Sequence, residues 1–306
     1  MKYIYFLVIW IGCTCALQGQ NNPLYTMFVF NKLQYNAAYA GSKGAPTVGA
    51  HYRHQWHGFE GAPRTITLFG HTPLADKRSG LGLSLISDEI GMFNTYYATG
   101  SYAYRIAFKN DTKLSLGLQA QYDHSRVDWT KLDLLDNIDV GLPIDLNSLS
   151  AFNVGAGIYY SGPKFFVGAS VPQLLRNSIT IDYYDNVGSL NSLRSYYGMG
   201  GLVIDVTNNF QLKPSFLVSY VPNAPFEMDL NLSALLMKII WVGANYRKDE
   251  SIGGFVQFPV GENLKLAFGV DYAITALNQY TKGSLEVMAE YVFRRKNDGV
   301  NNIRFF

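Results

Sequence analysis

The feature that most constrains the fold is a strict two-residue alternation of side chains over residues 47–71. In its first half one parity is apolar and aromatic, while the other carries Gly, His, Arg and Gln. Successive residues of a β-strand point to opposite faces, so the pattern predicts a hairpin with one apolar and one polar face. Such a polar face is exposed to water in a soluble β-sandwich and faces the lumen in an outer-membrane barrel.

The same alternation recurs along most of the chain, in segments of about nine to eleven residues, the length that a tilted strand needs to cross a bilayer. Gly, Tyr and Phe are abundant and charged residues make up only 16% of the chain, which agrees with an aromatic-rich β-protein. The predicted strands are 47–56, 64–71, 80–87, 94–108, 113–123, 150–161, 164–170, 195–206, 211–221, 226–236, 239–247, 251–259, 264–272 and 284–294.

The connections between these segments are sorted by length. If the first strand runs outward, most even-numbered connections are short, whereas the long ones, 124–149, 171–194 and 273–283, are odd-numbered. Bacterial barrels have short periplasmic turns and longer outer loops. We therefore predict an all-β transmembrane antiparallel up-and-down barrel of about 14 strands, within a range of roughly 12 to 16, in the outer membrane. The connection 72–79 and Pro214 inside a strand run against this pattern.

The sequence divides into three segments. Residues 1–19 have the features of a signal peptide, and both cysteines lie within them, so the mature chain has no thiol. Residues 20–46 lack clean alternation, and their pattern allows a plug in the lumen, a strand-like arm or a periplasmic lead-in. Residues 47–306 are expected to form the barrel. The formal net charge of +2 provides no basic field for nucleic acid.

Two runs of residues carry a resemblance to a known family. The runs are QNNPLYTMFVFNKLQYNAAYAG, residues 20–41, and YRHQWHGFEGAPRT, residues 52–65. They resemble the signature of the PorP/SprF family of Bacteroidota outer-membrane proteins, and a mid-chain element of that family is similar to GASVPQLL, residues 168–175. The matching positions are Asn31, Asn36, Ala38, Tyr39, Ala40, Gly41, Tyr52, Arg53, Gln55, Trp56, Gly61, Ala62, Pro63 and Thr65.

This resemblance implies a role that the alternation alone does not. Members of the family belong to the type IX secretion and gliding machinery and help large secreted surface proteins to reach or stay on the cell surface. The implied partners are an adhesin-like surface protein with a C-terminal sorting domain and periplasmic or outer-membrane lipoproteins of the machinery, besides the lipid bilayer. The alternative is a transport barrel for a small or hydrophobic solute, which the same alternation permits.

The polar parity of the first strand supplies candidate lumen contacts. His51, Arg53, Gln55 and His57 fall on it, and we expect them to hold the N-terminal segment. A zinc site at His51, His54 and His57 is disfavoured, because a spacing of three on a strand puts His54 on the opposite face. We expect no metal or other cofactor.

Two long loops combine apolar and polar residues in a way that suits protein docking. The loop 124–149 is also acidic, and a plain solvated loop is the simplest interpretation of its charges. Calcium binding is left open, although the loop lacks the glycine and terminal Glu of an EF-hand loop. The candidate docking residues are Trp129, Leu132, Leu134 and Leu135 in this loop and Leu174, Leu175, Tyr183 and Tyr184 in the loop 171–194.

No motif in the chain indicates catalysis. A G-x-S-x-G elbow, a phosphate-binding glycine loop and an H-E-x-x-H pair are all absent from the sequence. We therefore expect a protein that acts by binding and is not an enzyme.

Overall fold

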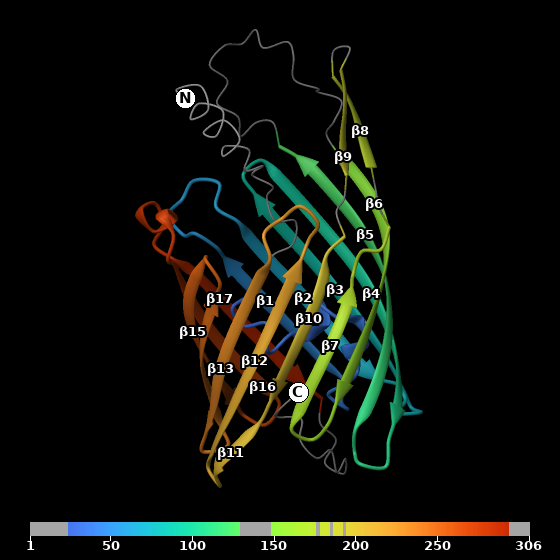
Figure 1. The fold of residues 1–306 in the computed structure, drawn as a ribbon, viewed down its shortest axis with the longest axis vertical. Coiled ribbons are helices and arrows are strands. Elements are labelled where there is room, and N and C mark those ends of the chain that lie inside the picture. The colour runs from blue at the N-terminus through green and yellow to red at the C-terminus, as the bar shows by residue number, and fades with distance from the viewer. Residues whose placement is uncertain (1–23, 129–147, 176–177, 184–185, 192–193, 294–306) are drawn as a thin grey trace, which may run out of the picture.

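A computed structural model describes residues 24–128, 148–175, 178–183, 186–191 and 194–293, with the backbone alone for 178–183 and 186–191. Tilted antiparallel strands form a closed ring of fourteen, each paired with its sequence neighbours (Figure 1). The ring closes where β1 pairs with β17, with Thr47 opposite Val292. The predicted up-and-down barrel is therefore confirmed, including its strand number.

The strand bounds follow the alternating segments to within a few residues. The wall consists of β1 Thr47–His54, β2 Arg64–Pro73, β3 Ser79–Ile90, β4 Phe93–Ala107, β5 Lys113–Val127, β6 Ser148–Ser161, β7 Phe165–Val171, β10 Tyr196–Leu202, β12 Phe210–Tyr220, β13 Glu227–Leu236, β14 Ile240–Arg247, β15 Ser251–Val260, β16 Leu264–Ala273 and β17 Ser284–Val292. A short strand β11, Ile204–Thr207, follows β10, and a separate hairpin consists of β8 Ser178–Tyr183 and β9 Asn186–Asn191.

Two predicted segments differ in detail. The loop 171–194 contains the β8–β9 hairpin, whose alternating sequence SITIDY favours a strand. The segment 195–206, predicted as one strand, is interrupted at Val203. The facing strand β12 carries Pro214. It pairs with β10 as far as Ser215 and with β11 from Leu212, so the break in pairing spans the proline. Since proline has no N–H to donate to the ladder, the break lies where the proline would otherwise cost a hydrogen bond.

The two faces of the wall have the composition expected of a membrane barrel. On β2, Thr67 is 0% exposed and points inward, whereas its neighbour Leu68 is 50% exposed and points outward. The same division holds around the ring, with buried Ser, Thr, Asn and Gln inside and exposed Leu, Ile, Val and aromatic residues outside. An apolar outer face is stable against lipid and costly against water.

The connections differ between the two ends of the barrel. One end, which we call the short-turn end, carries the turns 74–78, 108–112, 162–164, 208–209, 237–239 and 261–263. The opposite, long-loop end carries the longer connections 55–63, 128–147, 172–195 and 274–283, together with the tighter 91–92, 221–226 and 248–250. The sorting by length therefore holds in the structure.

The connection 72–79, which was too long for the predicted pattern, is only the turn 74–78 in the structure, because β2 and β3 extend further than predicted. Asp76 closes this turn by accepting hydrogen bonds from the backbone N–H groups of Arg78 and Ser79. The bond from the Ser79 backbone is the main reason that the pKa of Asp76 lies below its ordinary value.

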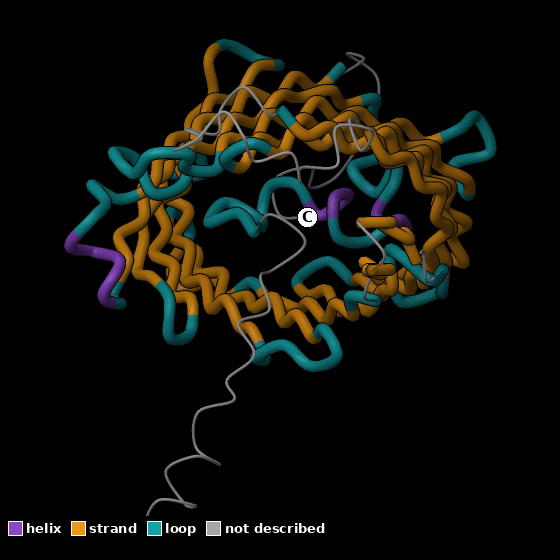
Figure 2. Tube along the Cα trace, turned by 90° about the horizontal axis from the view of Figure 1, so that it is seen from above, coloured by secondary structure: helices purple, strands orange, loops and turns teal. Residues whose placement is uncertain are grey.

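The described part of the N-terminal segment, residues 24–46, lies inside the ring of strands (Figure 2). We call it the inner segment. It contains two short 3₁₀-helices, η1 Lys32–Gln34 and η2 Ala37–Tyr39, and almost all of its residues are buried. A third 3₁₀-helix, η4 Ala276–Gln279, lies in the connection before β17. In the described residues, no helix has the length and apolar character needed to cross a membrane.

The outward orientation of Leu68 leads to a first prediction. Leu68→Arg should lower the free energy of unfolding by about 2–4 kcal/mol, because the charge must enter the hydrocarbon layer near its middle. Urea titration of the protein folded in lipid vesicles measures this difference. The matched control is Leu74→Arg in the turn 74–78, for which about 0–1 kcal/mol is expected. Equal losses in the two variants would contradict the assigned faces.

Candidate functional site

The inner segment is held in the lumen by a cluster of charged side chains near the long-loop end. Arg53 lies on the inward parity of β1 and is 1% exposed. Its Nη1 donates to Oδ2 of Asp271 on β16, 2.8 Å away, and also to Oε1 of Glu286 on β17. Arg53 and Glu286 lie directly opposite each other in the β1–β17 register. We call Thr26, His51, Arg53, Asp271 and Glu286 the Arg53 cluster.

The two carboxylates of this cluster bind the inner segment directly. The backbone N–H groups of Thr26 and Met27 donate to the two Glu286 oxygens at 2.7 and 3.0 Å. The Thr26 hydroxyl donates to Asp271 at 2.8 Å. A buried carboxylate is stable only when its oxygens are paired and hydrogen-bonded, so the segment and Arg53 together satisfy these acids.

His51 completes the cluster on the same face of β1. Its Nε2 lies 3.2 Å from Glu286 Oε2, and its ring packs against Tyr25 of the inner segment with centroids 4.4 Å apart. The hydroxyl groups of Tyr25 and Thr67 are hydrogen-bonded at 2.8 Å. His51 and Arg53 therefore both contact the segment, as Arg53 Nη1 also lies 3.4 Å from the Thr26 hydroxyl.

Asn36 fixes the middle of the inner segment. Its Oδ1 accepts the N–H of Ala38 at 2.9 Å, which caps η2. Its Nδ2 donates to the carbonyl of Ile158 on β6 at 3.0 Å and lies 3.3 Å from that of Ala169 on β7. This approach requires Gly157, because a Cβ there would lie 2.1 Å from Asn36 Oδ1.

The inner segment leaves the lumen near the start of β1, where a second set of contacts holds it. Lys43 forms an ion pair with Glu290 on β17, and Arg105 on β4 donates to the carbonyl of Ala40. Gly41 has a φ of +68°, and its N–H donates to Nδ1 of His71 at 3.1 Å. A side chain at this glycine would be strained and would also meet Arg105 and β2.

Tyr39 lies at the centre of an aromatic cluster between these anchors. Its ring packs edge-on against His71 and Tyr159, each with centroids 5.6 Å away. The buried ammonium of Lys32 lies over the rings of Tyr39 and Phe166, at 5.2 and 4.7 Å, and donates to the carbonyl of Val29. Two aromatic faces and this carbonyl are therefore the contacts described for the Lys32 head group.

Asn31 is the signature residue whose role the contacts do not explain. It is buried, and neither its side-chain oxygen nor its nitrogen has a hydrogen-bond partner among the described residues.

The second signature run forms the turn at the long-loop end between β1 and β2. The prediction that β1 continues to Trp56 is wrong by two residues, because Trp56 has a φ of +51° and leaves the strand. The N–H of Gln55 donates to the carbonyl of Pro63, and Gly61, with a φ of +71°, accepts from the N–H of Gly91. Gln55 therefore closes the turn, and the contacts described for it do not reach the inner segment.

Tyr52 and His57 lie away from the lumen contacts. Tyr52 is on the outward parity of β1, opposite Ile66 and Val287. His57 follows the end of β1 and its N–H donates to the carbonyl of Gly283. Its Nδ1 lies 3.3 Å from that of His54, whereas His51 faces Glu286 in the lumen. The three histidines therefore do not converge, and within the described residues no group of three His, Cys, Asp or Glu is arranged to hold a metal ion.

The proposed docking loops are only partly described. Leu174 and Leu175 are exposed just after β7, where the Asn153 side chain holds the Leu175 backbone through its N–H and its carbonyl. Tyr183 ends β8, of which the backbone is described. Trp129, Leu132, Leu134, Leu135 and Tyr184 lie outside the described residues.

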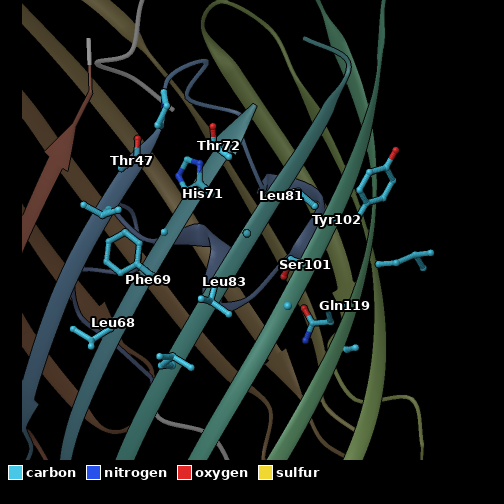
Figure 3. A pocket seen from close by; sticks show the side chains of 18 residues that line it. Thr47, Leu68, Phe69, His71, Thr72, Leu81, Leu83, Ser101, Tyr102 and Gln119 are labelled. Carbon is cyan, nitrogen blue, oxygen red and sulfur yellow. The ribbon is translucent and has the colours of Figure 1, made fainter. Parts of the chain in front are cut away.

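A hollow of about 920 Å³ lies over β1 to β5 (Figure 3). Leu68, Leu81 and Leu83, which line it on neighbouring strands, are all exposed residues of the outward parity. The hollow therefore opens on the apolar outer face, and inward residues such as His71, Ser101 and Gln119 also line it.

The acidic partners of the inner segment, Asp271, Glu286 and Glu290, were not predicted. Each lies on the buried parity of the last two strands, so an acid on the parity opposite to the exposed apolar residues was the available signal. That signal does not identify what the acid binds, because the partner is far away in the chain.

Comparison with known proteins is consistent with this architecture. Residues 17–291 match the family described as type IX secretion system membrane protein PorP/SprF. The sequence has no match among curated proteins. The match and the barrel together place the chain in the outer membrane.

Solved structures with a similar fold are outer-membrane barrels. The CymD monoaromatic hydrocarbon channel is similar over 91% of this chain and 95% of its own, with 11% identity and a TM-score of 0.53. A FadL homologue from Pseudomonas aeruginosa has 11% identity over 90% of this chain and 96% of its own, with a TM-score of 0.48. At this level of identity CymD shows the fold alone.

The Arg53 cluster leads to a second prediction. Arg53→Ala should lower the free energy of unfolding by about 3–5 kcal/mol, because Asp271 and Glu286 would remain buried with no cation between them. Urea titration with loss of the heat-modifiable folded band measures it. Arg64→Ala, on the same hairpin but exposed, is the control and should stay within about 0.5 kcal/mol. A stable double variant Arg53→Ala with His51→Ala would refute the idea that this network tethers the segment.

Proposed function

The chain belongs to the PorP/SprF family of type IX secretion system membrane proteins, and from this we propose that it binds large secreted surface proteins and helps to export or anchor them. The family and the barrel fold are non-enzymatic kinds of protein. The observation that carries the proposal is the position of the inner segment in the lumen, where three sets of contacts hold it. We infer that a barrel with this interior presents its loops for binding of other proteins.

The proposed partners would meet the two ends of the barrel. The long-loop end carries the extended connections and is the side expected to face the outside of the cell. Exposed Leu174 and Leu175 lie at its base and begin a surface suited to protein contact. We infer that an adhesin-like protein with a C-terminal sorting domain binds here, and that lipoproteins of the machinery bind at the periplasmic, short-turn end.

Transport of a small or hydrophobic solute is the competing function. A channel needs a continuous path through the lumen, whereas residues 24–41 are buried among lumen side chains. The likeness to a hydrocarbon channel concerns the fold and does not favour transport. Binding is therefore the better-supported proposal.

The binding role is tested by purifying the tagged mature protein from its own outer membrane in mild detergent and identifying the co-purifying chains. We expect a large surface protein and lipoproteins of the secretion machinery. Replacing 129–147 or 178–191 by short Gly/Ser linkers should remove the surface protein and leave a folded barrel. Replacing the turn 108–112 at the opposite end is the control, and unchanged recovery with all three replacements would refute the docking role of the loops.

The filled lumen is tested by conductance in planar bilayers. The mature protein should be electrically silent, because the inner segment occupies the path of ions. A variant that lacks residues 24–41 should conduct once it is shown to fold by heat-modifiable mobility. Steady conductance by the unaltered protein would favour transport over binding.

A further inference from the structure

A small cavity lies in the lumen between the inner segment and the wall strands β3 to β5. Its volume is about 50 Å³. Residues 33–35 of the inner segment line one side of it, and the buried side chains of Ser84, Thr99 and Gln121 line the other. None of these three wall residues belongs to the sets of contacts that hold the inner segment.

Two polar atoms of this cavity have no hydrogen-bond partner among the described residues. They are the Ser84 hydroxyl and Oε1 of Gln34. Ser84 is only 5% exposed, so its hydroxyl is largely withdrawn from bulk water. A hydroxyl can accept a hydrogen bond, and an amide oxygen can only accept one. The cavity therefore offers acceptors to a ligand that donates.

Two acidic residues lie beside the cavity, on its side towards the long-loop end. Asp88 follows the lining residue Ile86 by two positions on β3, and Asp123 follows Gln121 by two positions on β5. Asp88 accepts from the Thr65 hydroxyl at 2.6 Å, and Asp123 accepts from the Gln121 amide at 2.7 Å. Neither carboxylate has an ion pair in the described part of the chain.

Asp88 differs in this respect from the other buried acids that the structure describes. Each of the other four has a cation within ion-pair distance: Asp271 and Glu286 have Arg53, Asp229 has Arg247, and Glu290 has Lys43. A buried carboxylate needs such a partner, because its loss of water is costly. The positive charge that would complete this site is therefore missing from the described residues.

Tyr97 lies between the two acids on the intervening strand β4. It is opposite Asp123, and Thr95, two positions earlier on the same face, is opposite Asp88. Tyr97 is half-buried and lines the cavity. An aromatic ring beside two carboxylates attracts a cation, and a planar guanidinium also stacks on such a ring. Its five N–H donors suit the unpartnered acceptors of the cavity.

We propose that this cavity and its two acids bind the guanidinium group of an arginine on the secreted surface protein, which enters from the long-loop end. One carboxylate accepts hydrogen bonds from the guanidinium, and the other attracts it by its charge. The size is suitable, because a water needs about 10–15 Å³ of such space and the cavity therefore holds about as many waters as guanidinium has heavy atoms. Water alone would satisfy Ser84 and Gln34 but would not supply the missing charge. This inference rests on the proposed function, because it names a group by which the surface protein is held.

A metal ion is a poorer occupant of this site. Asp88 and Asp123 lie on strands that have β4 between them, and neighbouring strands are about 4.8 Å apart. Two carboxylates at roughly twice that spacing do not both coordinate one ion. A lysine ammonium would supply the charge, but it is a compact point charge that does not match the ring face and the acceptors as guanidinium does.

The test uses the purified mature protein in lipid nanodiscs and the peptide acetyl-Gly-Arg-Gly-amide. The control peptide has citrulline in place of arginine, because citrulline has nearly the same shape and no charge. Saturation-transfer NMR measures binding of each peptide, with empty nanodiscs as the blank. The arginine peptide should bind at least about tenfold more tightly, because hydrogen bonds to charged groups are the stronger ones.

Two conservative substitutions test the acids. In Asp88→Asn with Asp123→Asn, each amide oxygen can still accept from Thr65 or Gln121, and only the charges are lost. This double variant should bind the arginine peptide at least about tenfold more weakly. Its midpoint of unfolding in urea should not be lowered, because no ion pair within the protein is lost. Asp111→Asn in the exposed turn 108–112 is the matched control and should bind within about twofold of the unaltered protein.

Substitution of the ring provides a test that does not alter charge. Tyr97→Leu should weaken binding of the arginine peptide about threefold, because the aromatic face is lost, whereas Tyr97→Phe keeps that face and should stay within about twofold. Heat-modifiable mobility shows that each variant is folded.

Several results would overturn the proposal. These are absence of binding of the arginine peptide, equal binding of the two peptides, unchanged binding by the double variant, and a lowered urea midpoint of that variant, which would make the acids structural. If the surface protein co-purifies equally with the double variant, the arginine site fails while the proposed function stands. If no surface protein co-purifies with the unaltered protein, the proposed function fails, whereas the peptides still show whether the cavity binds guanidinium.

Discussion

One buried carboxylate, that of Glu286, joins the barrel wall to the inner segment. It accepts from Arg53 on the neighbouring strand and from two backbone N–H groups of the inner segment, and it lies beside His51. Removing such an acid from water is unfavourable unless all of these partners are present together. Wall and interior therefore stabilise each other: the segment helps to satisfy inward acids of the strands, and the strands satisfy peptide groups of the segment.

This dependence explains how polar side chains of the lumen find partners where the inner segment lies. The glycine at position 157 leaves room for the Asn36 amide, and backbone carbonyls of two strands accept from it. Farther down, Lys43 and Glu290 neutralise each other. Where the inner segment lies, the interior is therefore held by paired polar and charged groups.

The fold was largely predictable because the two-residue period directly reports a strand and its two faces. The period also placed His51 and Arg53 correctly in the lumen. It failed at Trp56, where a left-handed backbone ends the strand, and at Val203, where Pro214 across the sheet interrupts the ladder. Both failures arise from backbone chemistry, which hydrophobic periodicity does not register.

The partners of the inner segment could not be predicted in the same way. Periodicity assigns a residue to a face, but it does not say which residue lies across the lumen. Thr26 and Asp271 are 245 positions apart in the sequence, and Lys43 and Glu290 are 247 apart. Only the register of a closed ring brings them together. The signature residues Asn36 and Gly41 could be identified, whereas the acids that complete the site could not.

The same separation in sequence affects when the contacts of the inner segment form during folding. The inner segment is made first, yet its ionic partners belong to β16 and β17, which are made last. These contacts are among the longest-range in the chain, and closing so large a loop delays the step in which they form. The final pairing of β17 with β1 brings Glu286 and Glu290 to the segment. Closure of the ring and filling of its interior therefore become one late cooperative event, and a barrel that has not closed leaves its acids without their cations.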